Sequence, residues 1–294
     1  MENENRPSYP DEYVEIDGRI TYQIWELMPQ GDYDAFGHTI SHLGVEVHHK
    51  LRALIYHRER YIETEKAYLL ECIEKGMSSA RIPTNLLFDF EAFLFQTKSA
   101  LDIAVKLLDY LFPDSFRTHT FQDKGKKLIS NLHKYADRLE KEDRAKGSTE
   151  QSELAITYRR ETIEQIINLL QDERVKWLSD AIDARDTISH YKGTFTLANY
   201  EIETIGKQST ITLPKIAERE PRAFMDVTYQ NLLEFLQDFF SLFVVLWLPP
   251  MFALRPVNVD QGDLARWNNL PQAKFIKYTI GIRPWPKTAI NPSN

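Results

Sequence analysis

Cysteine is nearly absent from this sequence, in which Cys72 is the only one among 294 residues. A single cysteine excludes an intrachain disulfide framework, so a reducing cytoplasm is the expected compartment. Because Cys72 falls on an apolar face of a helical pattern, we expect a small buried side chain rather than a nucleophile.

An excess of positive charge is missing as well. The chain has 36 Lys and Arg against 43 Asp and Glu, which gives a formal net charge of -7. A protein that coats nucleic acid without sequence preference is expected to be strongly basic, so this class is disfavoured. Any contact with RNA is therefore expected to be local.

The sequence also lacks an uninterrupted apolar run long enough for a membrane span. The longest charge-free run, residues 239–254, is interrupted by Pro249 and Pro250 and is preceded by Asp238. This pattern predicts a buried core helix rather than a membrane-spanning one. The N-terminal residues show no basic and then apolar layout of a signal peptide, so we expect no membrane partner.

Apolar and aromatic residues, in contrast, are plentiful, at 43% and 12% of the chain. They are enough to bury a large core. Helical periodicity predicts long helices over residues 36–75, 86–111, 122–146, 150–190 and 222–248, with a bend near 171–173 in the fourth. The expected fold is therefore mainly α, a helical bundle over residues 36–250.

The segments outside the long helices have other patterns. Proline and glycine punctuate residues 1–35, which predicts short strands or an extended N-terminal arm that packs on the bundle. After Gly193 the period becomes alternating, which predicts a small β-hairpin insert at about 194–214 with a turn at Gly206. The C-terminal extension, 251–294, is rich in proline and tryptophan and is expected to lie as an irregular tail across the bundle or on a partner chain.

Histidines on the first long helix raise the question of a metal. His38 and His42 are four residues apart, and Glu46 extends the same face by one turn, which is an acceptable ligand spacing. No HExxH motif and no cysteine partner accompany them. We therefore expect solvated histidines, no metal and no cofactor, and a metal-binding bundle is the least favoured of three hypotheses.

The strongest candidate site lies at the end of the fourth helical pattern, where Arg185, Asp186 and His190 fall within six residues. Asp186 and His190 are four residues apart and can touch, so the carboxylate would orient the imidazole and favour its protonated form. Arg185 and His190 are separated by about 140° around an ideal helix. Their convergence requires a helix end that loosens before Gly193.

These residue types suit the cleavage of RNA by its own 2′-hydroxyl. His190 can take a proton from the attacking hydroxyl or give one to the departing 5′-oxygen. The guanidinium of Arg185 can neutralise charge on the phosphorane by contacting two phosphate oxygens. No metal is required, and the expected products are a 2′,3′-cyclic phosphate and a 5′-hydroxyl.

The stretch Arg185-Asp186-Thr187-Ile188-Ser189-His190 resembles the motif of the HEPN superfamily, which is Arg, then Asn, Asp or His, then three residues and His. An earlier stretch, residues 91–102, is similar to the helix that faces this motif in some HEPN families. The resemblance covers roughly residues 36–250, although its specific part is only six residues long.

The resemblance implies a HEPN-like helical bundle that acts as a metal-independent endoribonuclease, either in antiviral defence or as the toxin of a toxin–antitoxin system. HEPN active sites are typically composite, so one motif per chain implies a homodimer whose two histidines divide the acid and base roles. An antitoxin or sensor protein is a further implied partner. The candidate substrate-binding residues are Lys98, Ser99 and Asp102 on the facing helix and Tyr191 and Lys192 beside the motif.

A second hypothesis is a non-catalytic HEPN-like module that binds RNA or another protein. In that case Arg185, Asp186 and His190 would form a structural network at a helix end. The net negative charge of the chain is an argument for this alternative, and the nuclease stays the first of the three hypotheses.

Overall fold

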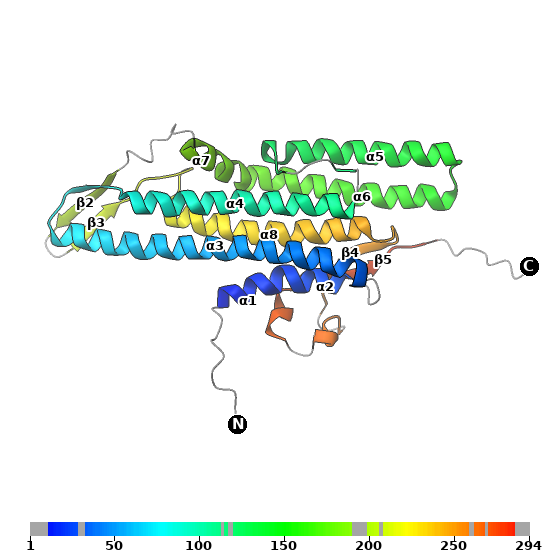
Figure 1. Cartoon of the computed structure of the whole chain (residues 1–294), viewed down its shortest axis with the longest axis horizontal. Helices are drawn as coiled ribbons and strands as arrows, with labels where there is room; N and C mark the ends of the chain where they lie inside the picture. Colours follow the sequence, from blue (N-terminus) through cyan, green and yellow to red (C-terminus); the bar gives the residue numbers. More distant parts are fainter. Residues whose placement is uncertain are drawn as a thin grey trace, which may run out of the picture.

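The computed structural model describes residues 11–28, 33–112, 115–116, 120–189, 199–205, 208–258, 262–267 and 270–285. It is mainly α-helical, with small antiparallel sheets and an irregular C-terminal region, as the sequence predicts (Figure 1). The long helices are α3 (Tyr33–Glu74), α4 (Thr84–Leu111), α5 (Lys126–Lys146), α6 (Glu150–Glu173), α7 (Ser179–Ser189) and α8 (Pro221–Trp247). The bend expected near residues 171–173 is a π-helical turn, Arg174–Leu178, between α6 and α7.

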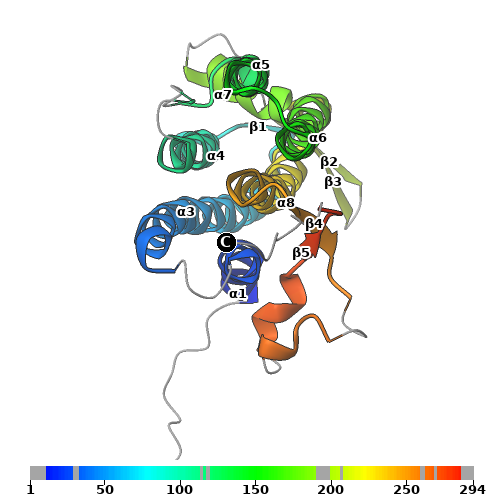
Figure 2. The same cartoon turned by 90° about the vertical axis from the view of Figure 1, so that its right-hand side faces the viewer.

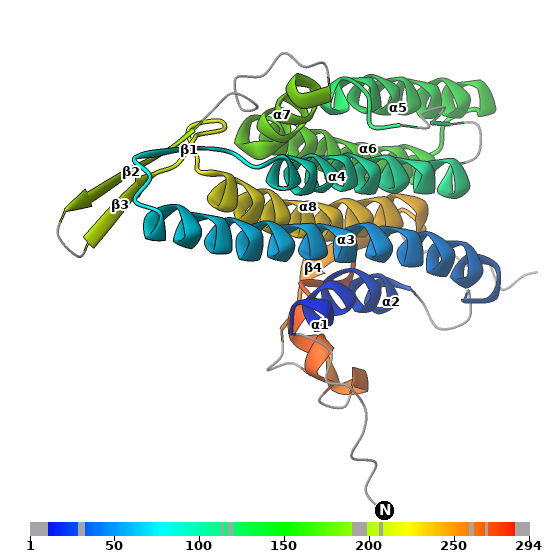
Figure 3. The same ribbon diagram turned by 60° about the vertical axis from the view of Figure 1, so that its left-hand side comes forward.

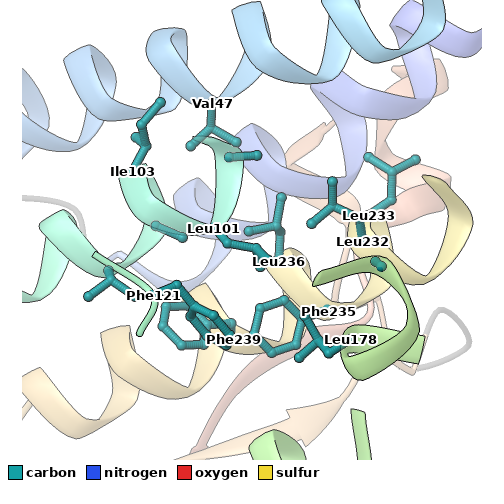
Figure 4. Close-up of a cluster of buried hydrophobic side chains, with 14 of the residues drawn as sticks. Val47, Leu101, Ile103, Phe121, Leu178, Leu232, Leu233, Phe235, Leu236 and Phe239 are labelled. Atoms are coloured by element: carbon teal, nitrogen blue, oxygen red, sulfur yellow. The ribbon is translucent and has the colours of Figure 1, made fainter. Parts of the chain in front are cut away.

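Helix α8 lies at the centre of the bundle and is buried along most of its length. Helices α3 and α4 run side by side over it, and the α5–α6 hairpin extends from the opposite side (Figures 1 and 2). Figure 4 shows Phe235 and Phe239 of α8 beside Leu101 of α4, Phe121 and Leu178. Full burial of each such side chain contributes roughly 1.5–3 kcal/mol.

The charge-free run at 239–254 forms the end of α8, the turn that follows it and the first residues of β4 (Phe252–Pro256). The expectation of a buried core helix is confirmed for this segment, because Phe239, Phe243 and Val244 are fully buried. Within the described ranges, no helix has both the length and the apolar character needed to cross a bilayer.

A small three-stranded antiparallel sheet lies at one end of the bundle, formed by β1 (Ser79–Arg81), β2 (Asn199–Ile205) and β3 (Gln208–Thr212). The predicted hairpin is present as β2 and β3, with Glu201 opposite Thr212. Strand β2 also pairs with β1, which comes before α4, so the hairpin is anchored to the bundle. Buried Cys72 packs under this sheet, as expected of a structural cysteine. The first residues of the expected insert, 194–198, and the turn at Gly206 lie outside the described residues.

The prediction of strands or an extended arm is wrong for residues 11–28, which are helical. They form α1 (Asp11–Asp17), a π-helical turn (Gly18–Tyr22) and α2 (Gln23–Leu27). Ile16, Ile20 and Ile24 are spaced four residues apart and are all buried. Their helical spacing places them on one face, which outweighs the strand preference of β-branched residues once that face packs on the bundle.

The C-terminal region crosses the bundle beside these N-terminal helices, one of the two placements expected (Figures 1 and 2). It contains a β-ladder that the sequence analysis missed, made by β4 (Phe252–Pro256) and β5 (Tyr278–Ile282), with 3-10 turns at Ala265–Trp267 and Pro271–Phe275. The segments taken from the sequence as an arm and a tail are therefore in contact.

One buried glutamine joins the two ends of the chain. The Gln23 Oε1 atom accepts hydrogen bonds from the backbone N–H groups of Lys277 at 2.8 Å and Tyr278 at 3.1 Å, and Gln23 Nε2 donates to the Tyr278 carbonyl at 2.9 Å. Gln237 of α8 donates to the same Gln23 oxygen at 3.1 Å. Because buried polar groups are costly when unpaired, this network fixes the C-terminal segment on α2 and α8.

Gly18→Ala is expected to weaken this association. A Cβ at residue 18 would lie 2.4 Å from a ring carbon of Phe275 and 3.1 Å from the Gln272 carbonyl oxygen. The resulting overpacking should lower the free energy of unfolding by about 1–2 kcal/mol net, despite the helix preference of alanine. Urea unfolding and limited proteolysis of the C-terminal segment measure the effect. Gly44→Ala in α3 is the matched control, because a Cβ there meets no atom within 4 Å, and equal stability of the two variants would contradict the expectation.

A buried carboxylate links α3, β2 and α8. Glu65 is fully buried and accepts hydrogen bonds from the hydroxyls of Tyr200 at 2.8 Å and Tyr61 at 3.2 Å. Its other oxygen forms an ion pair with the Arg222 guanidinium of α8. Burial raises the pKa of both tyrosines, so each hydroxyl stays protonated and donates to Glu65.

Candidate functional site

Helix α7 carries the first residues of the candidate motif. It follows the π-helical turn directly, and Trp177, Leu178 and Ala181 at this junction are buried in the core. Their burial fixes the rotation of α7, so that Arg185 and Asp186 lie on a partly exposed side. The described residues of α7 end at Ser189, and His190, Tyr191 and Lys192 lie outside the described part of the chain.

Arg185 is held by contacts on two sides. Its Nη1 atom donates to Asp186 Oδ1 at 2.6 Å, and its Cζ atom lies 5.3 Å from the centre of the Phe95 ring of α4. The side chain is 32% exposed. Stacking on an aromatic ring and pairing with a carboxylate both limit the rotamers of the guanidinium. The group is therefore positioned in advance and still reachable from solvent.

Asp186 has a different partner from the one that the sequence emphasised. Its spacing from His190 predicts that it orients that imidazole, whereas the structure shows one of its oxygens bound to Arg185. Its contact with His190 stays a prediction, because His190 is not among the described residues. A carboxylate has two oxygens, so the pair with Arg185 leaves Oδ2 to serve a second donor.

The candidate residues of α4 lie on the helix that faces α7, which is the placement expected for residues 91–102 (Figure 3). Lys98 forms an ion pair with Asp102, four residues later on the same helix. Asp102 Oδ1 also accepts the backbone N–H of Phe121 at 2.6 Å. Asp102 thus fixes the chain at Phe121, just before the 3-10 turn Asp123–Gly125 that leads into α5, which is a structural task.

The segment fixed by Asp102 reaches across to α7. Lys124 lies just after Phe121, and its Nζ atom donates to Asp183 Oδ2 at 2.7 Å. Helix α7 is therefore connected to α4 by the stack of Arg185 on Phe95 and through this short segment. These contacts hold the two helices in one register near the motif.

Ser99 and Asp102 line a surface cavity of about 540 Å³ between α3 and α4. The other lining residues are Glu46, His49, Lys50, Ile103, Lys106 and Thr120. The wall is mixed in charge, with two lysines against two carboxylates. Ser99 follows Phe95 by one helical turn, so it lies on the same side of α4 as the ring that contacts Arg185.

The metal hypothesis gains no support from the residues that can be placed. The side chains of His38 and His42 are not among the described ones, and Glu46 lines the cavity beside His49. Within the described part of the chain, no three His, Cys, Asp or Glu side chains lie close enough together to hold a metal ion.

Phe95 is a residue of the site that was not predicted from the sequence. Its signal was an aromatic residue off the apolar face of α4, and Phe88, seven residues earlier, has the same character.

Comparison of the chain with family models, with curated proteins and with solved structures gave no match. A function for this chain therefore has to be inferred from its own residues and their geometry.

Proposed function

We propose that this protein is a metal-independent endoribonuclease of the HEPN type. The observation that carries the proposal is Arg185, a partly exposed guanidinium held by Phe95 and Asp186 at the end of the helix that leads to His190. A cation fixed in this way stabilises charge that develops on a phosphorane without reorganising during the reaction. The resemblance of residues 185–190 to the HEPN motif supports the same assignment.

In the proposed reaction the 2′-oxygen of RNA attacks the adjacent phosphorus, and the bond from phosphorus to the 5′-oxygen breaks. One histidine takes the proton of the 2′-hydroxyl, and a second gives a proton to the departing 5′-oxygen. We assign these roles to His190 and to its copy in a homodimer, because each chain contains one such motif. Arg185 contacts two non-bridging oxygens through its planar fork.

A chemical test of the reaction class uses a labelled single-stranded RNA in the presence of EDTA. The expected products carry a 2′,3′-cyclic phosphate and a 5′-hydroxyl, and a 2′-deoxy substitution at the cleaved position should block the reaction. Protein with both Arg185 and His190 replaced by alanine, purified in the same way, controls for contaminating nuclease. Loss of cleavage in EDTA, or cleavage of the 2′-deoxy substrate, would exclude the mechanism.

A cellular role as a toxin or antiviral effector, restrained by an antitoxin or sensor protein, follows from the HEPN resemblance alone. Expression in a bacterial host should then arrest growth, and the double variant at Arg185 and His190 should not. The competing non-catalytic module is favoured by the ion pair between Arg185 and Asp186, which satisfies the guanidinium within the chain. Under that alternative the double variant changes stability or binding, and no RNA is cleaved by either protein.

A further inference from the structure

Positive charge is concentrated on one stretch of α3, although the whole chain is acidic. Residues 48–60 have four basic residues and one acidic residue, in a protein with a formal net charge of -7. The charged and titratable members are His48, His49, Lys50, Arg52, His57, Arg58, Glu59 and Arg60. A local excess of this kind is the pattern that a polyanion recognises on an otherwise acidic protein.

The outer face of this stretch is organised around a buried carboxylate. Asp89 of α4 is buried, and its Oδ1 atom lies 3.1 Å from His57 Nδ1 while its Oδ2 atom lies 3.1 Å from Arg60 Nε. Arg60 Nη1 donates to the Tyr56 hydroxyl at 3.2 Å. Asp89 therefore positions an imidazole and a guanidinium side by side at the surface. The ring nitrogen of His57 that does not face Asp89 is Nε2.

Accessibility separates these cations from their neighbours. The Arg60 side chain is 48% exposed, and the Tyr56 hydroxyl is the first cause of its raised pKa, followed by the charge of Asp89, so it carries full charge. Arg58, by contrast, forms an ion pair with Asp226 of α8, and Arg52 lies over the Tyr13 ring. Arg60, beside Asp89, is thus more exposed than Arg58, whereas Lys50 lines the cavity between α3 and α4.

Exposed aromatic rings accompany these cations. Tyr56 is 53% exposed on α3, and Phe88 and Phe95 are 62% and 37% exposed on α4. Phe88 precedes Asp89 in sequence, and Phe95 follows two turns later on the same face, about 10 Å along the helix. Exposed rings interleaved with arginine are typical of platforms on which unpaired bases stack.

We infer that Tyr56, His57, Arg60, Phe88 and Phe95, together the stacking platform, bind single-stranded RNA and direct it to Arg185. Phe95 belongs to both features, since the Arg185 guanidinium lies 5.3 Å from its ring centre. A base stacked near Phe95 would bring its phosphate towards that guanidinium. The direction of the strand rests on the proposed function, whereas binding to the platform does not.

The platform selects a single strand over a duplex for a physical reason. Bases in an A-form duplex are stacked on one another, and their faces are closed to side chains. Exposed rings can stack only on bases that are splayed out. The free energy of this stacking depends little on the base sequence. The mixture of arginine and histidine with these rings matches the alternation of phosphate and base in an unpaired strand.

The test measures binding on protein that carries His190→Ala, so that no substrate is lost by cleavage. Fluorescence anisotropy with a labelled 12-nucleotide single-stranded RNA of mixed sequence gives the affinity. Combined Tyr56→Ala and Phe88→Ala should raise Kd at least about ten-fold, because each base stack contributes a factor of that order. Arg60→Ala should reduce the slope of log Kd against log salt concentration by about one, the value expected when one phosphate contact is lost.

Matched variants separate stacking from loss of fold or charge. Phe88→Tyr should keep the affinity and Phe88→Leu should lose it, because only the former retains an aromatic face. Val175→Ala and Lys75→Ala remove an exposed apolar residue and an exposed cation elsewhere and should leave Kd unchanged. Unchanged affinity in the Tyr56 and Phe88 double variant, or a duplex bound as tightly as the single strand, overturns the inference.

The outcomes also separate this inference from the proposed reaction. Protein that binds single-stranded RNA through the platform but does not cleave it upholds the platform and defeats the nuclease assignment. Protein that cleaves RNA at the same rate with and without Tyr56 and Phe88, with unchanged Kd, supports the nuclease and defeats the platform.

Discussion

Arg185→Ala is expected to lower the rate of RNA cleavage by about 10²–10³-fold, and His190→Ala by about 10²–10⁴-fold. Loss of Arg185 removes a cation that its neighbours hold in place before substrate arrives, so the developing charge on the phosphorane loses its partner. Loss of His190 removes proton transfer at both oxygens of a symmetric dimer. Single-turnover cleavage at saturating protein isolates the chemical step from binding.

Arg185→Lys should restore little of this activity. An ammonium group has no planar fork for two phosphate oxygens, and it does not lie flat on the Phe95 ring as a guanidinium does. Phe95→Leu should lower the rate several-fold by loosening the guanidinium, since it keeps apolar volume without an aromatic face. Lys176→Ala, at an exposed cation on the preceding π-helical turn, is the control and should keep the wild-type rate.

Equal cleavage rates in the wild type and the two alanine variants would contradict the proposed site. If Arg185→Ala, His190→Ala and the wild type cleave RNA at one rate, the activity belongs to a contaminant or to another site. If all three fold normally and none cleaves RNA, the non-catalytic module becomes the better assignment. Circular dichroism and urea unfolding on the same samples establish that a loss of activity is not a loss of fold.

The long helices were predictable because their apolar period is local and regular. Phe239 and Phe243 on α8, for example, are one turn apart and both buried, as the pattern required. The N-terminal helices were missed because Ile16, Ile20 and Ile24 have both a strand preference and a helical spacing, and packing on the bundle decides between them. The ladder that places Phe252 opposite Ile282 depends on pairing across a long connection, which local pattern does not encode.

The sequence could nominate the residues of the candidate motif but not their contacts. Arg185 and Asp186 lie in the last turns of α7, as their local pattern predicts, and the place of His190 stays a prediction. The stack of Arg185 on Phe95 depends on the register of two helices far apart in sequence, and the hydrogen bond from Phe121 to Asp102 depends on the path of a loop. Spacing along one helix could therefore nominate Asp186 but not show that it binds Arg185.

Glu65→Ala is expected to be the most destabilising single change outside the hydrophobic core, by about 3 kcal/mol. It removes a fully buried carboxylate that accepts from Tyr61 and Tyr200 and pairs with Arg222. Removing one member of a buried ion pair typically costs about 3–5 kcal/mol because its partners are left without compensation. Arg222 is partly exposed, so water relieves part of that cost, and the lower end of the range applies.

Urea unfolding measures this loss, and the matched variants identify its origin. Glu65→Gln keeps acceptor capacity at the amide oxygen and should lose less stability than Glu65→Ala. Glu71→Ala, on the same helix with an exposed ion pair to Lys75, should change the free energy of unfolding by less than about 0.5 kcal/mol. In a double-mutant cycle with Arg222→Ala, the two losses should not add, because both remove the same pair. A Glu65→Ala protein within about 1 kcal/mol of the wild type would mean that the hydroxyls and the guanidinium find other partners, and that α3, β2 and α8 do not depend on this carboxylate.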